Sequence, residues 1–552
     1  MKEEIKKLIE KAIKDLQKEK KLPEFQIPNI SIFNSKILSY GDYNTDILFK
    51  LNKIYNISPE VIVKPLFKKI TSSNTYDKFD DVELLNGFIN FFIKDEYLQN
   101  QLEVILKEKD KFGNLNLEEK VHPVKSAKGG TSLKAKQFNR VNIEFISANP
   151  TGPLTLGNGR GGFCGDALAN ILEKAGYKVS REYYVNDTGN QINKLGHSVI
   201  GDAEAVYKGE YINELQKKIK GNNPQDIGEK ASKVIFEKMI KPSVKKMGVK
   251  FDTWFSEKTL YKNKEVDEAI NELSKKGFTY ESEGALWFRS KDLGDDKDRV
   301  LIRADGIKTY FASDIAYLKN KFKRDFNKLI IFLGADHYGY VPRLKAASHA
   351  LGFGKDSIDA IVMQLVRLFE KGKEVRMSKR NGIYVTIDEL IDEVGLDVAR
   401  FFFLMIGPNT HLNFNLDLAK EKSEKNPVFK VQYAYARICS ILRKSRNFQF
   451  SIFNFQSNYN FKLLNEKSDL ELIKTLIRFS EIIEDTAKDY QVQRLPKYAM
   501  ELADSFHRFY ENCQVISKNK ELTKARLFLI SAAKIILKNT LDLMGISAPE
   551  KM

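Results

Sequence analysis

One short loop constrains the fold of this chain more than any other segment. Residues 147–162 are rich in glycine and proline and lie between an apolar stretch, RVNIEFIS (140–147), and an amphipathic run, GFCGDALANILEKAGYKV (162–179). The first pattern predicts a strand and the second a helix, and SREYYVND (180–187) predicts the next strand. Strand, helix and strand in this order predict a βαβ unit, which packs as parallel strands with a right-handed crossover.

The same alternation returns further along the chain. Two apolar strand segments, 328–336 and 360–369, flank a predicted helix at 341–353, and another helical run follows at 387–405. The stretch between the two halves, at about 190–300, is rich in Lys and Glu and predicts a helical insertion. Two such halves predict an α/β fold with a Rossmann-like, doubly wound parallel sheet. Ligands of such sheets bind beyond the carboxyl ends of the strands, at the topological switch point.

The rest of the 552-residue chain predicts two further domains, because one core does not extend over this length. Residues 111–420 hold the predicted sheet. Amphipathic runs dominate residues 421–552 and predict an all-α bundle. Residues 1–110 predict a small α+β domain, whose first helix carries one apolar stripe: Ile5, Leu8, Ile9, Ala12, Ile13 and Leu16.

Composition excludes several classes of protein. No apolar run approaches the roughly 18 residues of a membrane span, and the charged start of the chain lacks the apolar core of a signal peptide. We therefore expect a cytoplasmic protein without membrane contact. Cys164, Cys439 and Cys513 lie far apart, which excludes a disulfide framework and a cysteine-rich zinc site. The net charge of +17 is typical of a protein that binds a polyanion such as RNA, although A+T-rich coding alone would produce the same excess of Lys.

Two loops at strand ends indicate a nucleotide site. In PLTLGNGR (153–160), Pro153 fixes a turn, and Gly157 and Gly159 allow close backbone approach where a helix begins. A helix N-terminus favours phosphate. The second loop, EVRMSKRNG (374–382), is basic and can neutralise charge as pyrophosphate leaves. Each loop alone is equally consistent with an ordinary turn or a solvated loop. Both loops, however, follow strands of the same predicted sheet.

These two loops resemble the HIGH and KMSKS signature motifs of class I aminoacyl-tRNA synthetases, and the wider context resembles bacterial arginyl-tRNA synthetases. Strings similar to that family occur in the same order nearly from end to end. They are GDYNTDILFKL, GFINFFI, VNIEFISANPTGP, YYVNDTGNQI, FLGADHYGYVPR, MSKRNG, NPVFKVQYAYARICSI and MGISAPEKM.

The resemblance implies ATP-dependent ligation of L-arginine to tRNA(Arg). Arginine and ATP would form arginyl-adenylate and pyrophosphate, and tRNA would then take the arginine and release AMP. The implied plan is an N-terminal domain that contacts the tRNA elbow, a Rossmann catalytic domain and a helical domain that binds the anticodon. Mg²⁺ would accompany ATP, held mostly by phosphates and water, with no zinc and no dedicated protein metal site. We expect a monomer.

The resemblance also implies roles for individual residues. Thr155, Gly157, Asn158 and Lys379 match the catalytic positions. The positions that match ATP-binding residues of the family are Pro153, Gly157, Gly159, Asp336, His337, Arg376, Met377, Ser378 and Lys379. The positions that match arginine-binding residues of the family are Glu144, Asn149, Tyr310, Asp314, Asp187 and Gln191. Asp314 is the expected guanidinium partner, because a planar carboxylate pairs with guanidinium through two parallel hydrogen bonds.

Thr155 and Asn158 replace the two histidines of the usual HIGH motif. A hydroxyl and an amide can still donate hydrogen bonds to phosphate, but neither can carry a positive charge. The loss of the two histidines leaves open the alternative that the chain is a catalytically weak synthetase paralogue that acts as an RNA-binding protein. A small-molecule nucleotidyltransferase is a further alternative, although such enzymes lack a helical RNA-binding bundle. The presence of the other matching residues favours the active enzyme.

Overall fold

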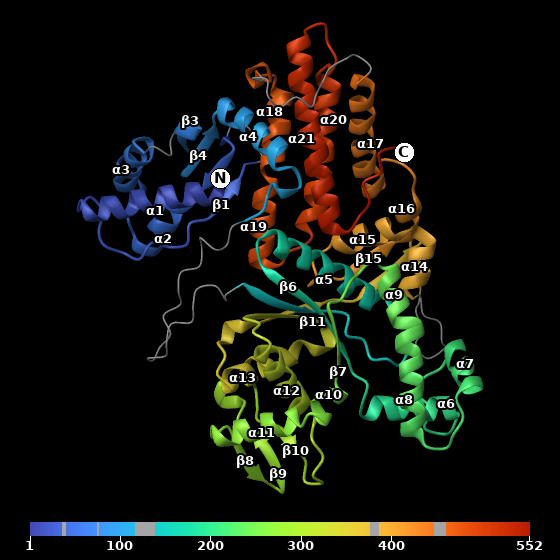
Figure 1. Cartoon of the computed structure of the whole chain (residues 1–552). Helices are drawn as coiled ribbons and strands as arrows, with labels where there is room; N and C mark the ends of the chain where they lie inside the picture. Colours follow the sequence, from blue (N-terminus) through green and yellow to red (C-terminus); the bar gives the residue numbers. More distant parts are fainter. Residues whose placement is uncertain (36–39, 74–76, 116–138, 376–385, 447–459) are drawn as a thin grey trace.

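The computed structural model describes residues 1–35, 40–73, 77–115, 139–375, 386–446 and 460–552. Its centre is a five-stranded, wholly parallel sheet in the order β12-β11-β5-β6-β7 (Figure 1). The strands are β5 (Arg140–Glu144), β6 (Lys178–Val185), β7 (Thr253–Ser256), β11 (Lys328–Gly334) and β12 (Ile358–Met363). The strand order reverses between β5 and β11, so the predicted doubly wound sheet and its switch point are confirmed.

Small residues let the first crossover helix, α5 (Leu156–Lys174), lie close to its neighbours. A Cβ added to Gly165 would lie 2.3 Å from the Phe145 ring, and one added to Gly159 would lie 2.5 Å from Ile387. Ile387 begins α14 (Ile387–Val394), and α15 (Leu396–Leu404) follows after Gly395. The glycines of this segment therefore permit close helix packing as well as a turn.

The expected insertion at about 190–300 is not purely helical. Helices α6 (Asn190–Ile200), α7 (Glu210–Lys218), α8 (Pro224–Ile235) and α9 (Lys241–Lys246) come first, and β7 then returns to the central sheet. Helices α10 (Lys258–Lys262) and α11 (Glu265–Lys275) precede an antiparallel sheet of β8 (Thr279–Ser282), β9 (Ala285–Phe288) and β10 (Arg299–Ile302). The prediction missed these strands because each has only four residues within a charged stretch.

The remaining α/β elements complete the region around the central sheet. Helix α12 (Tyr310–Lys323) leads into β11, and α13 (Val341–Leu351) links β11 to β12. The apolar run 360–369, expected as one strand, is divided between β12 and β13 (Val366–Glu370), which belong to different sheets. Strand β13 pairs with β14 (Lys373–Val375) and β15 (Leu412–Asn415), and α16 (Leu416–Lys420) follows.

The N-terminal region is α+β, as predicted. Its antiparallel sheet has the order β1-β2-β4-β3, and all six apolar residues of the stripe on α1 are buried. The elements are α1 (Lys2–Lys18), β1 (Ile32–Asn34), β2 (Tyr43–Thr45), α2 (Ile47–Tyr55), α3 (Pro59–Thr71), β3 (Phe79–Leu85), β4 (Phe88–Ile93) and α4 (Asp95–Glu108).

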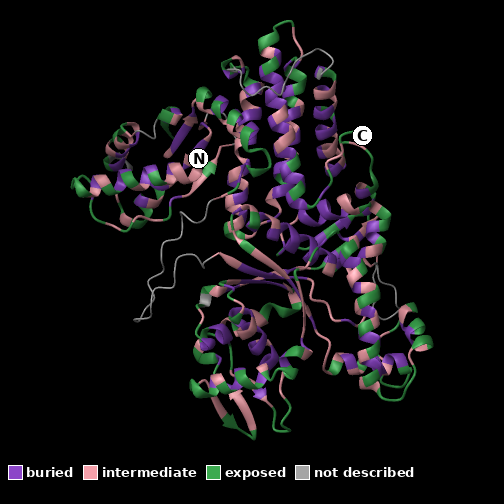
Figure 2. Cartoon of the chain, viewed as in Figure 1, coloured by how far each residue is buried: buried purple, intermediate pink, exposed green. Residues whose placement is uncertain are grey.

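The C-terminal region is the predicted helical bundle. It contains α17 (Pro427–Arg446), α18 (Lys467–Ile477), α19 (Phe479–Asp489), α20 (Arg494–Asn512) and α21 (Lys520–Met544). Figure 2 shows buried residues running along the inner faces of these helices and into the central sheet. None of the described helices is long and apolar enough to cross a membrane. The three cysteines are all buried and unpaired.

Arg400 joins three parts of the chain. Its guanidinium donates to the carboxylate of Asp166 on α5 at 2.9 Å, to Met247 O after α9 at 2.9 Å, and to Met544 O at the end of α21 at 2.8 Å. Only 1% of Arg400 is exposed. Gly545 has φ +66°, and a Cβ there would lie 2.0 Å from Arg400 Nη1. The helix that follows the first loop is therefore fixed to the last helix of the bundle.

Candidate active site

The first loop ends in a capped helix. Thr155 is the N-cap of α5, and its side chain accepts from Asn158 N. In return, Asn158 Oδ1 accepts from Thr155 N at 3.0 Å and from Thr155 Oγ1 at 2.9 Å. The hydroxyl hydrogen of Thr155 is thus committed within the loop. Within the described ranges no hydrogen bond engages the Asn158 NH₂ group, so this group is free to donate to a ligand.

The backbone turns sharply just before this loop. Ile146 and Ser147 have φ values of +64° and +38°. A β-branched residue rarely adopts such a left-handed conformation. Ser147 Oγ accepts from Tyr184 N at 3.0 Å, which ties the turn to β6. Backbone strain of this kind persists where the surrounding structure holds it, often at functional sites.

A cavity of about 810 Å³ opens on the first loop at the switch point of the sheet. Its lining combines the loop and the start of α5 with the ends of β11 and β12. The lining residues are Ile146, Thr155, Leu156, Gly157, Asn158, Gly161, Phe332, Leu333, Gly334, Ala335, Asp336, Met363, Gln364, Leu365 and Val366. An apolar wall beside a helix N-terminus suits a nucleotide, since the base needs the wall and the phosphates need the N–H groups.

A buried cation lies next to this cavity. Arg160, in the second turn of α5, is fully buried and donates to Gln364 O, Gly407 O and Thr410 O, each at 2.8 Å. Burial lowers its pKa. In the part of the chain that the structure describes, no carboxylate forms an ion pair with Arg160. Its charge is therefore offset only by carbonyl dipoles, and it favours an anion in the adjoining cavity.

Not every residue predicted for ATP lies at this cavity. Gly157, Asn158 and Asp336 line it, whereas Pro153, Gly159 and His337 do not. Gly159 is buried against Ile387, and Asp336 and His337 are exposed after β11. The predicted residues Arg376, Met377, Ser378 and Lys379 lie outside the described residues.

The residues predicted for arginine gather at the neighbouring strand ends. Tyr310 and Asp314 both lie on α12, four residues and hence about one turn apart. Tyr310 Oη accepts from Asn190 N at 3.1 Å, at the start of α6. Gln191, the next residue, accepts from the side chain of Asn149 at 2.5 Å. The fold thus brings residues from three distant segments to one place.

Carboxylates converge on the same place. Asp187 accepts from Ser256 Oγ at 2.6 Å and from Lys258 N at 3.2 Å. Tyr340 donates to the half-buried carboxylate of Asp314. Glu257, just after β7, is also buried, with 1% exposed. A cluster of acids at the exits of β5, β6 and β7 is suited to a cationic ligand.

Burial and the neighbouring carboxylates both raise the pKa values of acids in this cluster. Burial raises the pKa of Asp314 to about 7; the Tyr340 hydrogen bond opposes the shift, and Glu144 adds to it. Burial also raises the pKa of Glu257 to about 7, and Asp314 is the second cause. A guanidinium placed among these groups would offset their repulsion.

Helix α12 is held in place by the residues that follow Asp314 on the same face. Tyr317 donates to Glu182 on β6 at 2.6 Å, and Arg324 donates to both oxygens of Glu182 at 2.7 and 2.8 Å. Lys321, which is fully buried, donates to Glu144 at the end of β5. Glu144 is thus paired within the protein, and it contributes to the acidic cluster by its charge.

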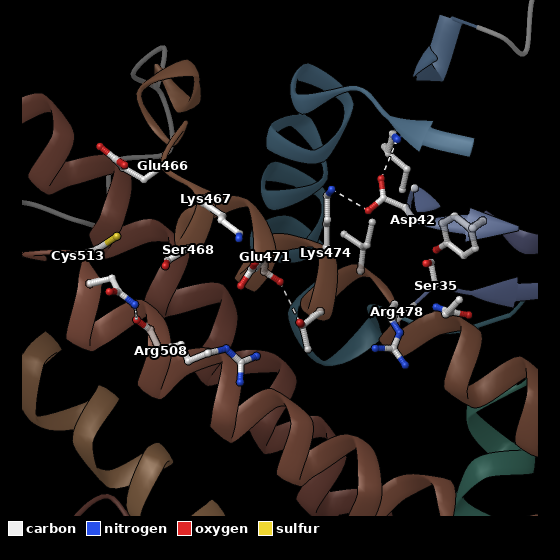
Figure 3. Close-up of a pocket in the computed structure, with 17 residues that line it drawn as sticks. Ser35, Asp42, Glu466, Lys467, Ser468, Glu471, Lys474, Arg478, Arg508 and Cys513 are labelled. Carbon is white, nitrogen blue, oxygen red and sulfur yellow. Dashed lines mark hydrogen bonds and ion pairs between the residues drawn. The ribbon is translucent and has the colours of Figure 1, made fainter. Parts of the chain in front are cut away.

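Another cavity lies away from the central parallel sheet, between the N-terminal region and the bundle (Figure 3). Its volume is about 870 Å³, and Lys467, Lys474, Arg478 and Arg508 line it together with acidic and polar residues. Lys474 bridges the two regions through an ion pair with Asp42 at 2.7 Å.

Comparison with known proteins identifies the family. A model described as "tRNA synthetases class I (R), catalytic domain" matches residues 120–200 and 200–402. "Arginyl tRNA synthetase N terminal domain" matches 3–93, and "DALR anticodon binding domain" matches 431–552. The arginine--tRNA ligase of Acetivibrio thermocellus is 39% identical, covering 100% of this chain and 99% of that protein. The chain belongs to the arginyl-tRNA synthetase family.

Further relatives agree with this membership. The arginine--tRNA ligase of Caldanaerobacter subterraneus is 41% identical over 100% of this chain and 99% of its own. The solved arginyl-tRNA synthetase of Thermus thermophilus has a TM-score of 0.74 and 20% identity, covering 99% of this chain and 100% of that one, which supports the fold. The comparisons do not support the alternative of a paralogue that only binds RNA.

Sequence reasoning missed one residue of the acidic cluster, Glu257, and the tyrosine that donates to Asp314, Tyr340. Glu257 lies in the stretch taken for an insertion, and its position depends on β7, which was not predicted. Tyr340 lies in the FLGADHYGYVPR string but was not assigned a role. The aromatic pair in TWFS (253–256), followed directly by Glu257, was the only local signal for this residue.

Proposed function

We propose that this protein attaches L-arginine to tRNA(Arg) in two steps at the exits of the central sheet. The observation that carries the proposal is the acidic cluster of Asp314, Glu257, Glu144 and Asp187 beside a nucleotide-sized cavity. In the first step, the arginine carboxylate attacks the α-phosphate of ATP and pyrophosphate leaves. In the second, a ribose hydroxyl of the terminal adenosine attacks the carbonyl carbon. The new ester bond forms, the bond to AMP breaks, and the hydroxyl proton passes to solvent.

Positioning and charge stabilisation account for most of the proposed catalysis, since neither step needs a protein nucleophile. Asn158 donates its NH₂ group to phosphate, and Thr155 holds Asn158 in position through the cap. Arg160 and the N-terminus of α5 supply the positive field that the missing histidines would have provided. Lys379 and Arg376 are proposed, from the family resemblance, to contact the β- and γ-phosphates. Mg²⁺ is proposed to enter with ATP, held by phosphate oxygens and water.

Arginine is proposed to lie with its guanidinium between Asp314 and Glu257. Tyr310 would form one wall, and Glu144 would add negative charge. The α-amino group would meet Asn149, which Gln191 holds at 2.5 Å. Asp187 is proposed to orient the same end of the substrate. This arrangement favours arginine over lysine, because only a planar guanidinium can bond two carboxylates through fixed pairs of N–H groups.

The other regions are proposed to bind tRNA. Residues 1–110 would contact the elbow and residues 421–552 the anticodon, while residues 111–420 carry out catalysis. The positive net charge supports binding to RNA phosphates. We infer a cytoplasmic monomer; buried, unpaired thiols are suited to a reducing compartment.

Pyrophosphate exchange tests the proposed reaction. Purified protein, ATP and radiolabelled pyrophosphate are incubated with arginine, with and without tRNA(Arg). We expect label to enter ATP only when arginine is present. The absence of exchange in both conditions would exclude the proposed activity, and exchange with lysine or citrulline in place of arginine would exclude the proposed specificity.

The affinity for arginine is expected to depend strongly on pH. Asp314 and Glu257 have pKa values of about 7 in the free protein, so below pH 7 arginine must displace their protons before it can bind. The KM for arginine should therefore rise as pH falls, by up to about a hundredfold between pH 8 and pH 6 if both groups titrate. Exchange kinetics measure this change, with the KM for ATP as the internal control. An arginine KM that stays constant over this range would contradict the assignment.

Asn158→Ala should lower the rate of adenylate formation far more than Asn158→His. Alanine removes the donor to phosphate, and a hydrogen bond to a charged group contributes about 1.5–3 kcal/mol, so a loss of roughly 10- to 100-fold is expected. Histidine restores a donor and should remain within a few-fold of the parent. Pre-steady-state adenylate formation measures both variants. An unchanged rate in Asn158→Ala would remove the donor role from this residue.

A further inference from the structure

The first loop makes a tight turn directly after Asn149. Thr151 N donates to Asn149 O at 2.7 Å, which closes a three-residue turn around the buried Pro150. Because the main chain between the two residues is so short, a shift of Thr151 moves Asn149 with it. A group that fixes the carbonyl of Thr151 therefore also limits how the side chain of Asn149 is oriented.

Two helices of the insertion hold this turn, one by a contact before Pro150 in the chain and one by a contact after it. Gln191, at the start of α6, accepts from the side chain of Asn149 at 2.5 Å. Tyr211, at the start of α7, donates its hydroxyl to Thr151 O at 3.0 Å. Helices α6 and α7 thus fix the loop at the asparagine proposed to bind arginine and again two residues later.

The two helices are also tied to each other. Ser198 on α6 is only 1% exposed, and its hydroxyl accepts from Val206 N at 3.0 Å and from Tyr207 N at 2.9 Å, in the segment that leads to α7. Gln216 on α7 donates to Ser198 O at 3.1 Å. These bonds join α6 and α7 into one support, so Tyr211 has a defined position relative to the loop.

Gly152 leaves the space that the Tyr211 hydroxyl needs. A Cβ added at Gly152 would lie 3.1 Å from Tyr211 Oη and 3.4 Å from Cζ, the ring carbon that bears the hydroxyl. The first distance is too short for an ordinary contact, whereas the second lies at the lower limit of one. Alanine at this position would therefore push the hydroxyl away from Thr151 O, but it would tolerate phenylalanine in place of Tyr211.

We propose that Tyr211 is a positioning residue for recognition of the α-amino group of arginine. The inference rests on the function proposed above, in which Asn149 meets this group. Tyr211 acts through the turn: it holds Thr151, and the turn then presents the side chain of Asn149 to the amine. The guanidinium is proposed to bind Asp314 and Glu257 on other elements, so its contacts should not depend on Tyr211.

Tyr211→Phe should raise the KM for arginine by roughly two- to tenfold, the effect of losing one neutral hydrogen bond. The KM for ATP should stay within about twofold, since the loop contacts that change are those of the amino acid. Pyrophosphate exchange in the presence of tRNA(Arg) measures both constants. Tyr280→Phe is the matched control: it removes a tyrosine hydroxyl bonded to Asp298 in the small antiparallel sheet, and it should change neither KM.

Two competitive inhibitors separate this positioning role from general damage to the pocket. Agmatine keeps the guanidinium and the amine of arginine but lacks the carboxylate, whereas 5-guanidinopentanoate keeps the guanidinium and the carboxylate but lacks the amine. Tyr211→Phe should weaken inhibition by agmatine by the same factor as it raises the KM for arginine, and it should leave inhibition by 5-guanidinopentanoate unchanged. Equal weakening of both inhibitors would mean that Tyr211 supports the pocket as a whole, and the proposed role would be wrong.

Gly152→Ala tests the same contact from the other side. By displacing the hydroxyl, it should raise the KM for arginine as Tyr211→Phe does. In the double variant the new methyl group meets a ring without a hydroxyl, so the KM should equal that of Tyr211→Phe alone. Multiplied effects, in a parent that exchanges normally, would overturn this inference and leave the proposed function standing. A parent without arginine-dependent exchange would overturn the proposed function, and the inference with it.

Discussion

Replacing Asp314 by Asn is expected to lower kcat/KM for arginine by at least about thirtyfold. The change keeps the shape of the side chain and its bond with Tyr340, but it removes the charge opposite the guanidinium. Loss of one partner from a desolvated charge pair costs about 2–5 kcal/mol, much of it from the charge that is left unpaired. Arginine-dependent pyrophosphate exchange measures the effect, and Asp292→Asn, at an exposed position, serves as the matched control.

The same substitution should not unfold the protein. The pKa of Asp314 is raised on folding, from 3.8 to about 7, so its ionised form costs stability at every pH above the unfolded value, with the full cost above pH 7. At pH 8 an amide at this position should leave the melting temperature unchanged or raise it. A variant with normal stability and kcat/KM within threefold of the parent would show that the guanidinium binds elsewhere.

Arg400→Leu is expected to cause the largest loss of stability, about 3–5 kcal/mol. The substitution leaves the buried carboxylate of Asp166 with only the longer ion pair to Arg181 at 3.8 Å, and it deprives Met247 O and Met544 O of their donor. Breaking a buried pair by removing one partner has a cost of this size. Urea unfolding measures it, with Arg437→Leu as the control, because Arg437 is exposed and contacts the ring and the hydroxyl of Tyr510 at the surface of the bundle.

A second substitution shows whether the unpaired charge is the cause. Adding Asp166→Leu to Arg400→Leu removes the stranded carboxylate and should recover part of the lost stability. Recovery should be incomplete, since the two carbonyls still lack a donor. If the double variant were less stable than Arg400→Leu alone, the stabilising role of this ion pair would be wrong.

The βαβ units were predictable because their signals are local. The apolar strands around the first loop, its glycines, and the stripe on α1 each occupy a short window of sequence. The parallel pairing of these strands followed from the strand, helix, strand succession and its right-handed crossover. Tyr310 and Asp314 could be placed on one helical face for the same reason, although their assignment to arginine came from the family resemblance.

The rest depended on contacts between distant segments. Whether Glu257 joins the acidic cluster is decided by the pairing of β7 with β6, and four residues are too few to predict a strand. Nothing near Arg160 in sequence indicates that it binds carbonyls more than 200 residues away. The internal bond between Thr155 and Asn158 was also unexpected, since both had been considered as separate donors to phosphate.

The Arg400 junction bears on how the chain folds during synthesis. The partner Asp166 precedes Arg400 by 234 residues, but Met544 follows it by 144. At the usual speed of roughly 5–20 residues per second, a ribosome needs about 7–30 seconds to make that last stretch. During this interval the catalytic region has emerged while one of its buried guanidinium contacts is still missing. A nascent chain therefore cannot complete its final structure until the bundle has been made. A product of premature termination would lack the contact through Arg400 that fixes α5 to the bundle.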